Sequence, residues 1–460
     1  MVFQLIYVKM KLLIYICSLA LLFAIGCEKN EASKILQTYI PPNINLAELE
    51  ANYLSKKTSA ADLTKNINGN TFSDRVSSYL RRSPDVAALQ SVIRKAQAQI
   101  KVTEDQKNAQ ISGGLTAGFD NQIQDYLGAG LTVSGEKIIF DAQKTDLSIS
   151  EVSTQVALSE FQLAAFLESE TLSIASSYLD FLEAEIGIEL VQIRMKLLND
   201  NLEKIDKLVD AAILNVADKV SGEIAASRLE SLKENQNAQK KQAWSSLSRK
   251  LGSNLTFHNK EDVWKIFAKT SDFKFELANI PAVQIATLNL HTSKLKLLKA
   301  ERGIAPIVKV TGAISQPLNE LSDNETIRIG INVQTPLFKE KYLSSLIETE
   351  QLAVSYSESQ LEKTLQDIMV QGEVLKSALS SAETNRKLIE ESVELAEREL
   401  QFLERQVKVG QANLSQLISS HSQLLDYELR LNSARFEYFQ TKIRTLELNG
   451  RLREFLEIQL

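Results

Sequence analysis

Residues that could bind a metal or act as nucleophiles are few in this chain and lie far apart. The three histidines, His258, His291 and His421, fall in three different segments, so no two of them have the short spacing of a metal site. The glycines between Gly113 and Gly118 are not followed by a helix N-terminus, which a phosphate-binding loop requires. No convergent set of polar residues remains for catalysis. The sequence therefore predicts neither an enzyme nor a bound metal or cofactor.

Both cysteines lie in the first 27 residues, and the second has the setting of a lipid anchor. Lys11 precedes an apolar run of roughly 14 residues, which is too short to span a bilayer and is typical of a signal-peptide core. The run ends in Ala24-Ile25-Gly26-Cys27 and then turns polar, which resembles the lipobox of bacterial lipoproteins. We expect removal of residues 1–26 and acylation of Cys27, with a plain signal peptide as the alternative. Translation can start at Met1 or at Met10, directly before Lys11.

The composition favours long helices over other structures. The 460 residues include only 7 prolines and 17 glycines, whereas Leu, Ala, Glu, Lys, Gln and Ser are frequent. The net charge of -6 is modest and both signs are interleaved, so no basic face for nucleic acid is expected. After the N-terminal run, no segment of about 18 apolar residues occurs, so no membrane-spanning helix is predicted. Membrane-spanning strands remain compatible with the sequence.

The dominant feature of the chain is an internal repeat with an offset of 198 residues. Apolar residues recur every three or four positions between Phe181 and Val209. The same ladder returns between Leu379 and Val407, where only Arg386 is out of character. A heptad pattern of this kind keeps one stripe of a helix against a partner helix. The repeat therefore predicts a duplicated long-helix protein whose function depends on shape.

Each copy of the repeat begins with a helix and continues into a β-hairpin. Pro84 and Pro281 each suit the first turn of a helix of about twenty residues. The hydrophobic period then changes from helical to alternating. The predicted strands lie at 114–119, 128–133, 308–314 and 327–333. Four strands in one chain leave unpaired edges that lipid does not tolerate, so several chains must share one barrel if the strands enter a membrane.

A long helical hairpin completes each copy. Helical sequence of roughly 72 residues, or about 108 Å, extends from Phe140 to a turn at Ala212 and from Phe338 to a turn at Gly410. A returning helix of about 40 residues follows and ends at a glycine. The predicted organisation is a signal peptide at 1–26, an N-terminal lipid-anchored segment at 27–82, repeat 1 at 83–252, an equatorial insertion at 253–280, repeat 2 at 281–450 and a C-terminal tail at 451–460.

The order of these elements resembles the TolC family of outer-membrane efflux channels over about residues 75 to 450. The residues that carry the resemblance are Ser83-Pro84-Asp85-Val86, Pro336-Leu337-Phe338, the segment from Val409 to Leu414, and Leu446 to Gly450. The family implies a mainly α fold with a small β part. In it, duplicated helical hairpins form a trimeric α-barrel, and four strands per chain contribute to a shared outer-membrane β-barrel.

The resemblance also implies a function and partners. It implies an exit duct of a tripartite efflux or type I secretion system, located in the outer membrane and extending into the periplasm. The expected partners are two further copies, outer-membrane lipid, a periplasmic adaptor and an inner-membrane pump that is either ABC-type or proton-driven. Two alternatives stay open, a periplasmic adaptor of the membrane-fusion class and a coiled-coil scaffold lipoprotein. Two helical hairpins and only four strands count against the adaptor.

The residues at the periplasmic end of the family's helical hairpins can be matched one by one to positions in this sequence. The family's turn glycine falls on Gly410 in the second copy and on Ala212 in the first, and these turns would form the periplasmic tip that contacts the adaptor, near Lys408. Six residues beyond the glycine the family often has an aspartate. The first copy has Asp218 there and the second has Gln416. Two interpretations of these residues stay open: they form an acidic constriction, or they are solvated polar side chains near a turn.

Overall fold

A computed structural model of the chain describes residues 71–120, 126–211, 215–252, 267, 277–317, 326–335, 340–409, 411 and 413–459. These residues all belong to one unit, Lys65–Leu460. The predicted signal peptide, Cys27 and nearly all of the equatorial insertion lie outside the described residues, as do Ala212 and Gly410.

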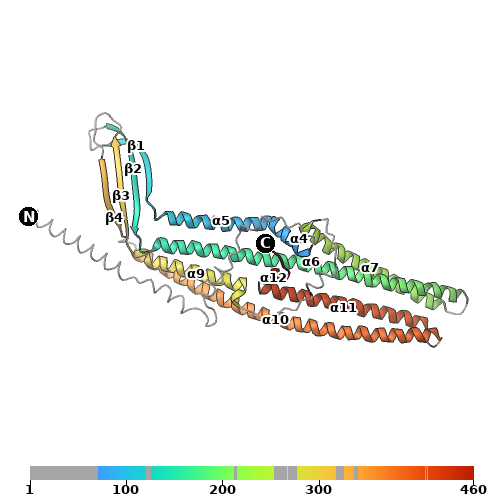
Figure 1. The fold of residues 1–460 in the computed structure, drawn as a ribbon. Coiled ribbons are helices and arrows are strands. Elements are labelled where there is room, and N and C mark those ends of the chain that lie inside the picture. The colour runs from blue at the N-terminus through green and yellow to red at the C-terminus, as the bar shows by residue number, and fades with distance from the viewer. Residues whose placement is uncertain are drawn as a thin grey trace, which may run out of the picture. The chain divides into compact units, whose positions relative to one another are not determined.

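The unit contains the predicted series of helix, β-hairpin, long helix and returning helix twice (Figure 1). The first series is α5 (Pro84–Asp105), β1 (Gln110–Asp120), β2 (Tyr126–Phe140), α6 (Lys144–Asp210) and α7 (Val216–Leu251). The second is α9 (Pro281–Glu301), β3 (Ile307–Pro317), β4 (Thr326–Gln334), α10 (Glu340–Lys408) and α11 (Leu414–Leu448). Two short helices, α4 (Phe72–Arg82) and α12 (Leu452–Phe455), flank them. The mainly α fold with a small β part is confirmed.

The ends of the helices follow local chemistry that the sequence shows. Pro84 and Pro281 occupy the first turns of α5 and α9, where their missing N–H is not needed. Gly252 and Gly450 follow α7 and α11 with φ of 93° and 65°, a backbone region that favours glycine. A Cβ at Gly450 would lie 3.1 Å from Cδ of Pro281, so the start of α9 also limits this position.

The heptad ladders pack the long helices against their partners. In the first hairpin, α6 packs along α7 and also along α11 of the second hairpin, around a buried cluster that includes Val191, Ile205, Leu229 and Leu425. In the second hairpin, α10 packs along α11 around a separate cluster. Arg386, the exception in the ladder, pairs with Glu390 at 3.1 Å, and Glu390 also accepts from Arg435 of α11 at 3.1 Å. Arg386 is thus paired within α10, and its partner Glu390 makes the charged contact with α11.

A second core lies near the middle of α6 and includes elements that the repeat did not predict. Helix α4 buries Phe72 there, and its ring stacks on Tyr178 of α6 with centroids 4.7 Å apart. Leu452 and Leu456 from the C-terminal segment are fully buried in the same cluster. Both short helices lie outside the predicted repeats at 83–252 and 281–450, so the repeat gave no signal for them.

A buried carboxylate holds the C-terminal segment in this core. Glu168 of α6 is 2% exposed and accepts hydrogen bonds from the backbone N–H of Leu452 at 2.9 Å and of Arg453 at 3.3 Å. Nε of Arg453 adds a third bond at 2.9 Å. Burial raises the pKa of Glu168, and the positive charge of Arg453 opposes this rise. An acidic group at the first turn of α12 also complements the helix dipole.

Candidate functional site

The four strands form one antiparallel sheet whose two faces differ in character. The order is β1-β2-β3-β4, and residues paired directly across neighbouring strands share a face. Apart from Lys137, at the end of β2 nearest α6, and Gln316, towards the other end of β3, the side chains described on one face are apolar or glycine. The apolar residues are Ile111, Leu115, Leu131, Val133, Val308, Val310, Ile314, Ile327, Ile329, Ile331 and Val333.

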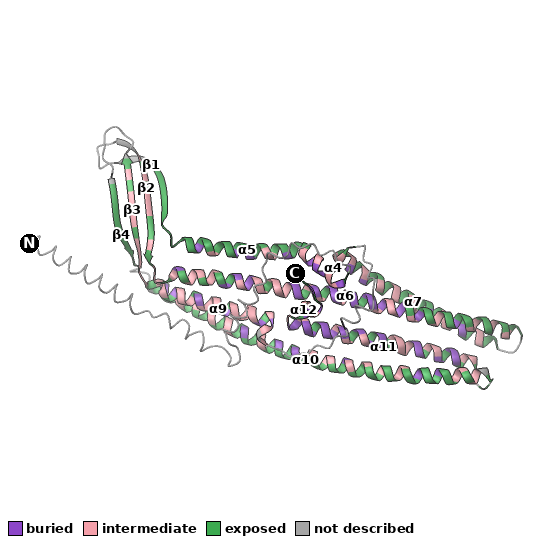
Figure 2. Cartoon of the chain, in the orientation of Figure 1, coloured by how far each residue is buried: buried purple, intermediate pink, exposed green. Residues whose placement is uncertain are grey.

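This apolar face is uncovered within the described chain. Ile329 is 82% exposed and Ile111 is 78% exposed, and Figure 2 shows exposed residues along the sheet. Monomeric soluble proteins rarely leave an apolar surface of this extent in water. The alternation of apolar and polar residues along each strand is the pattern expected where one face meets lipid and the other meets water.

The opposite face of the sheet is polar and carries its own hydrogen bonds. The hydroxyls of Ser112 and Ser134 lie 2.9 Å apart, and Nζ of Lys309 pairs with Glu136 at 3.0 Å. The outer edges of β1 and β4 have no strand beside them among the described residues. Open edges of this kind bind further strands, so the sheet is suited to continue into another copy of the chain.

The far ends of the two long hairpins are built alike, at positions 198 residues apart. Asn215 caps α7 and its side chain accepts from the N–H of Ala217 at 3.3 Å. Asn413 caps α11, and its N–H donates to Oε1 of Gln416 at 3.3 Å. Asp218 occupies the corresponding first-turn position of α7, where its charge complements the helix dipole. Both residues six positions past the turn therefore have a structural role in starting a helix.

The turn after α10 closes with a specific backbone pattern. The N–H of Gln411 donates to the carbonyl of Gln406 at 2.9 Å, across five residues. This is the longer bond of a Schellman motif, in which glycine is the usual residue directly before the donor. In this chain the residue directly before the donor is Gly410, which lies outside the described residues. Lys408 is the last residue of α10, and its side chain also lies outside them.

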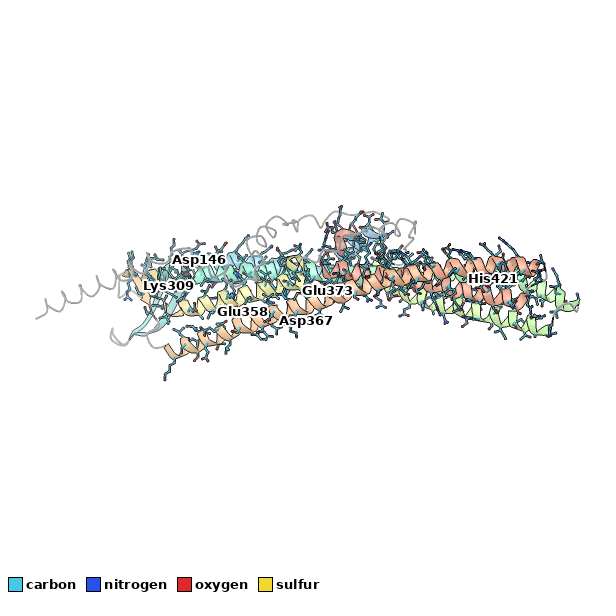
Figure 3. The ribbon with its side chains drawn as sticks, turned by 90° about the horizontal axis from the view of Figure 1, so that it is seen from below. Asp146, Lys309, Glu358, Asp367, Glu373 and His421 are labelled. Carbon is cyan, nitrogen blue, oxygen red and sulfur yellow. The ribbon has the colours of Figure 1, made fainter. Side chains whose placement is uncertain are left out.

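The two hairpins are joined by an ion pair and several polar contacts between α6 and α11. Arg194 of α6 makes a two-bond ion pair with Glu428 of α11, with Nε 3.1 Å from Oε2. Both side chains are largely buried. His421 of α11 lies near this pair and near Glu404, towards the hairpin end of the unit (Figure 3). Burial and the charge of Arg194 lower the pKa of His421, and its Nδ1 is buried without a hydrogen-bond partner.

One further ion pair links the hairpins at equivalent positions of the repeat. Arg228 of α7 donates through Nη2 to both carboxylate oxygens of Asp426 of α11, at 3.0 and 2.8 Å. The two residues are 198 positions apart, which is the repeat offset. The hairpins therefore lie side by side with equivalent residues at the same height along their axes.

No group of three or more His, Cys, Asp or Glu side chains in the described ranges is placed to hold a metal ion. None of the helices in that part of the chain combines the length and apolar character needed to cross a membrane.

Comparison with known proteins gives no match by sequence and clear matches by structure. No protein-family profile matches the chain, and no curated protein sequence does so either. Solved outer-membrane channels superpose on most of it. The resemblance to the TolC family is confirmed at the level of the fold.

Three of these structures illustrate the similarity. CusC, studied for its transmembrane channel formation, gives a TM-score of 0.71 at 13% identity over 84% of this chain and 93% of its own. The outer membrane protein VceC from Vibrio cholerae gives 0.69 at 15% identity over 82% and 95%. The CmeC outer membrane channel of Campylobacter jejuni gives 0.67 at 12% identity over 84% and 86%. These relatives are channels, not enzymes, and their fold extends over both copies of the repeat in this chain.

Proposed function

We propose that this chain is the outer-membrane exit duct of a tripartite efflux or type I secretion system. The observation that carries the proposal is the sheet at one end of the two long hairpins. It has one apolar face, one polar face and, among the described residues, two open edges. Three copies would join their sheets into one β-barrel in the outer membrane, and their hairpins would form an α-barrel in the periplasm. The fold shared with CusC, VceC and CmeC supports this arrangement.

The hairpin ends are the proposed docking site for a periplasmic adaptor. Apolar side chains are exposed beside both turns, at Val216, Val220 and Ile224 of α7 and at Val409 after α10. A helical hairpin of an adaptor could cover these side chains by packing its own apolar stripe against them. The proposed contact residues are those carried over from the family: Ala212, Asp218, Lys408, Gly410 and Gln416. An inner-membrane pump would then supply the cargo through the adaptor.

Cys27 is the proposed lipid anchor, since it follows Gly26 at the end of the short apolar run. Cys27→Ser should abolish incorporation of labelled palmitate into the protein. Unchanged labelling would show that this cysteine is not acylated.

The experiment that tests the duct combines mass and export. We expect the detergent-extracted protein to have the mass of three chains, and Gly410→Val and Lys408→Glu each to reduce export at an unchanged amount of assembled protein. Valine is unfavourable in the left-handed conformation by about 1 kcal/mol or more, so Gly410→Val should distort the turn. Lys376→Glu, on an exposed lysine of α10 far from the turn, is the matched control. A stable monomer, or normal export from both tip variants, would contradict the proposal.

A further inference from the structure

The repeat allows the contact between two copies of the chain to be derived from a contact within one copy. Adding 198 to a residue number converts α6 into α10 and α7 into α11. Within the chain, α6 packs on α11 of the following hairpin. The equivalent partner of α10 is α7 of a neighbouring copy, because the next hairpin after the second repeat is the first repeat of another chain. This step rests on the proposed oligomer.

The surfaces needed for this second contact are exposed in the single chain. On α10, Leu388, Leu395 and Phe402 recur every seven residues and are more than half exposed. Leu388 and Leu395 are equivalent to Leu190 and Leu197 of α6, which lie one turn on either side of Arg194. Leu190 packs against the buried cluster between α6 and α11, whereas Leu197 is 39% exposed. An apolar heptad stripe of this kind is stabilised when a partner helix covers it. Figure 2 shows exposed residues along both α10 and α7, the two outer helices.

The repeat offset of 198 residues gives the residues that are equivalent to each of these two ion pairs at the contact between copies. Only one of the two equivalent pairs consists of opposite charges. The pair of Arg194 with Glu428 converts into Ser392 with Glu230, so its positive partner is lost. The pair of Arg228 with Asp426 converts into Asp426 with Arg228 of the neighbouring copy, because the two residues are themselves related by the repeat. The second pair is therefore the one that the contact between copies retains.

We propose that Arg228 and Asp426 form a closed hoop of alternating charges in the assembled protein. Each Asp426 binds Arg228 of its own chain and also Arg228 of the neighbouring copy. The side chains have room for a second partner, since they are 54% and 37% exposed in the single chain. The existing pair uses only Nη2 of Arg228, so Nη1 and Nε are available for a second carboxylate.

The hoop would fix how neighbouring copies are aligned along the hairpin axes, close to the hairpin ends. Arg228 lies twelve residues beyond the start of α7, or about 18 Å from the hairpin end. A contact that repeats head to tail between identical chains closes into a ring when the rotation is right. The hoop would set the rotation between neighbouring copies, because it joins Arg228 and Asp426, which the repeat places at the same height along the hairpin axes.

Cross-linking in mixed assemblies tests the hoop directly. One chain carries Arg228→Cys and one tag, and a second chain carries Asp426→Cys and another tag. Each chain has one added thiol, so a short bifunctional thiol reagent can join the two tags only between copies. Random mixing in equal amounts places the two cysteines on facing copies in about a quarter of the contacts. We expect a cross-linked product that contains both tags.

The controls separate this inference from the proposed function. Replacing Arg228→Cys by Lys219→Cys moves the thiol to a residue that faces Asp206 of α6, and the cross-link should be lost. An intact trimer by mass without a two-tag product, or with equal product from the Lys219 control, would overturn the hoop while leaving the exit duct standing. A monomer by mass would overturn both.

A gain of stability tests the same register independently. Ser392→Arg would supply the positive partner that the contact between copies lacks, opposite Glu230 of the neighbouring copy. The trimer should then dissociate at a higher temperature, and adding Glu230→Gln should cancel the gain. Dissociation at the wild-type temperature by the assembled Ser392→Arg protein would contradict the register derived from the repeat.

Discussion

The buried lysine of α11 gives the sharpest test of the packing described above. Lys442 is 2% exposed, its Nζ donates to the backbone carbonyl of Phe267 at 2.9 Å, and it lies 4.9 Å from the ring centre of Phe455. Burial lowers its pKa to about 8. The lysine thus connects α11 to the equatorial insertion and to the C-terminal segment, and its charged form is disfavoured in that environment.

This pKa predicts how stability depends on pH. The unfolded lysine keeps its proton up to about pH 10.5, whereas the folded one loses it from about pH 8. Between these values the unfolded state binds more protons, so the free energy of unfolding rises with pH. The difference between a pKa of 10.5 and one of about 8 corresponds to roughly 3 kcal/mol. We expect this gain in the wild type and its absence in Lys442→Met.

The measurement is denaturant unfolding of the detergent-solubilised protein, followed by helical circular dichroism at fixed protein concentration between pH 7 and pH 10.5. The quantity of interest is the difference between wild type and Lys442→Met, because other lysines and tyrosines titrate in both proteins. Lys376→Met, at an exposed position of α10, is the control and should retain the wild-type pH dependence. Equal pH dependence in wild type and Lys442→Met would refute the burial argument.

Two further predictions concern the equatorial core. Glu168→Ala should lower the free energy of unfolding by about 2–4 kcal/mol, because it leaves the first N–H groups of α12 and the guanidinium of Arg453 without their carboxylate. In a double-mutant cycle with Arg453→Met, measured by thermal unfolding, additive losses would show that the two side chains are not coupled. Gly450→Ala should cost about 1–2 kcal/mol, from the left-handed backbone and the contact with Pro281, and Gly450→Asn should cost less. Equal melting temperatures for both Gly450 variants and the wild type would contradict this account.

Much of the fold could be predicted because it follows from periodic patterns of apolar and polar residues that are close together in the sequence. The heptad ladders, the alternation of the strands and the prolines at Pro84 and Pro281 act within a few residues of one another. The repeat then placed both hairpins in one register, and the ion pair of Arg228 with Asp426 shows that register in three dimensions. The irregular Arg386 was visible in the ladder, but its partners Glu390 and Arg435 were not.

The candidate site was predicted less completely than the fold. Asp218 and Gln416 were identified by resemblance as possible constriction residues, and the structure places both in the first turn of a helix, where Gln416 accepts a capping hydrogen bond. Periodicity did not predict α4 or α12, because both are short and lie outside the predicted repeats. A capping signal did exist for α4, where Thr71 and Asp74 form a capping box.

The sequence alone determined the duplicated series of elements, their lengths and the apolar stripe of each long helix, because these depend on contacts close in the chain. Only the tertiary structure decided which stripe meets which helix. It joined α6 to α11 through Arg194 and Glu428, 234 residues apart, and brought the C-terminal segment to Glu168, 284 residues away from Leu452. Such pairings depend on burial and charge that arise when distant helices meet, and no local pattern encodes them.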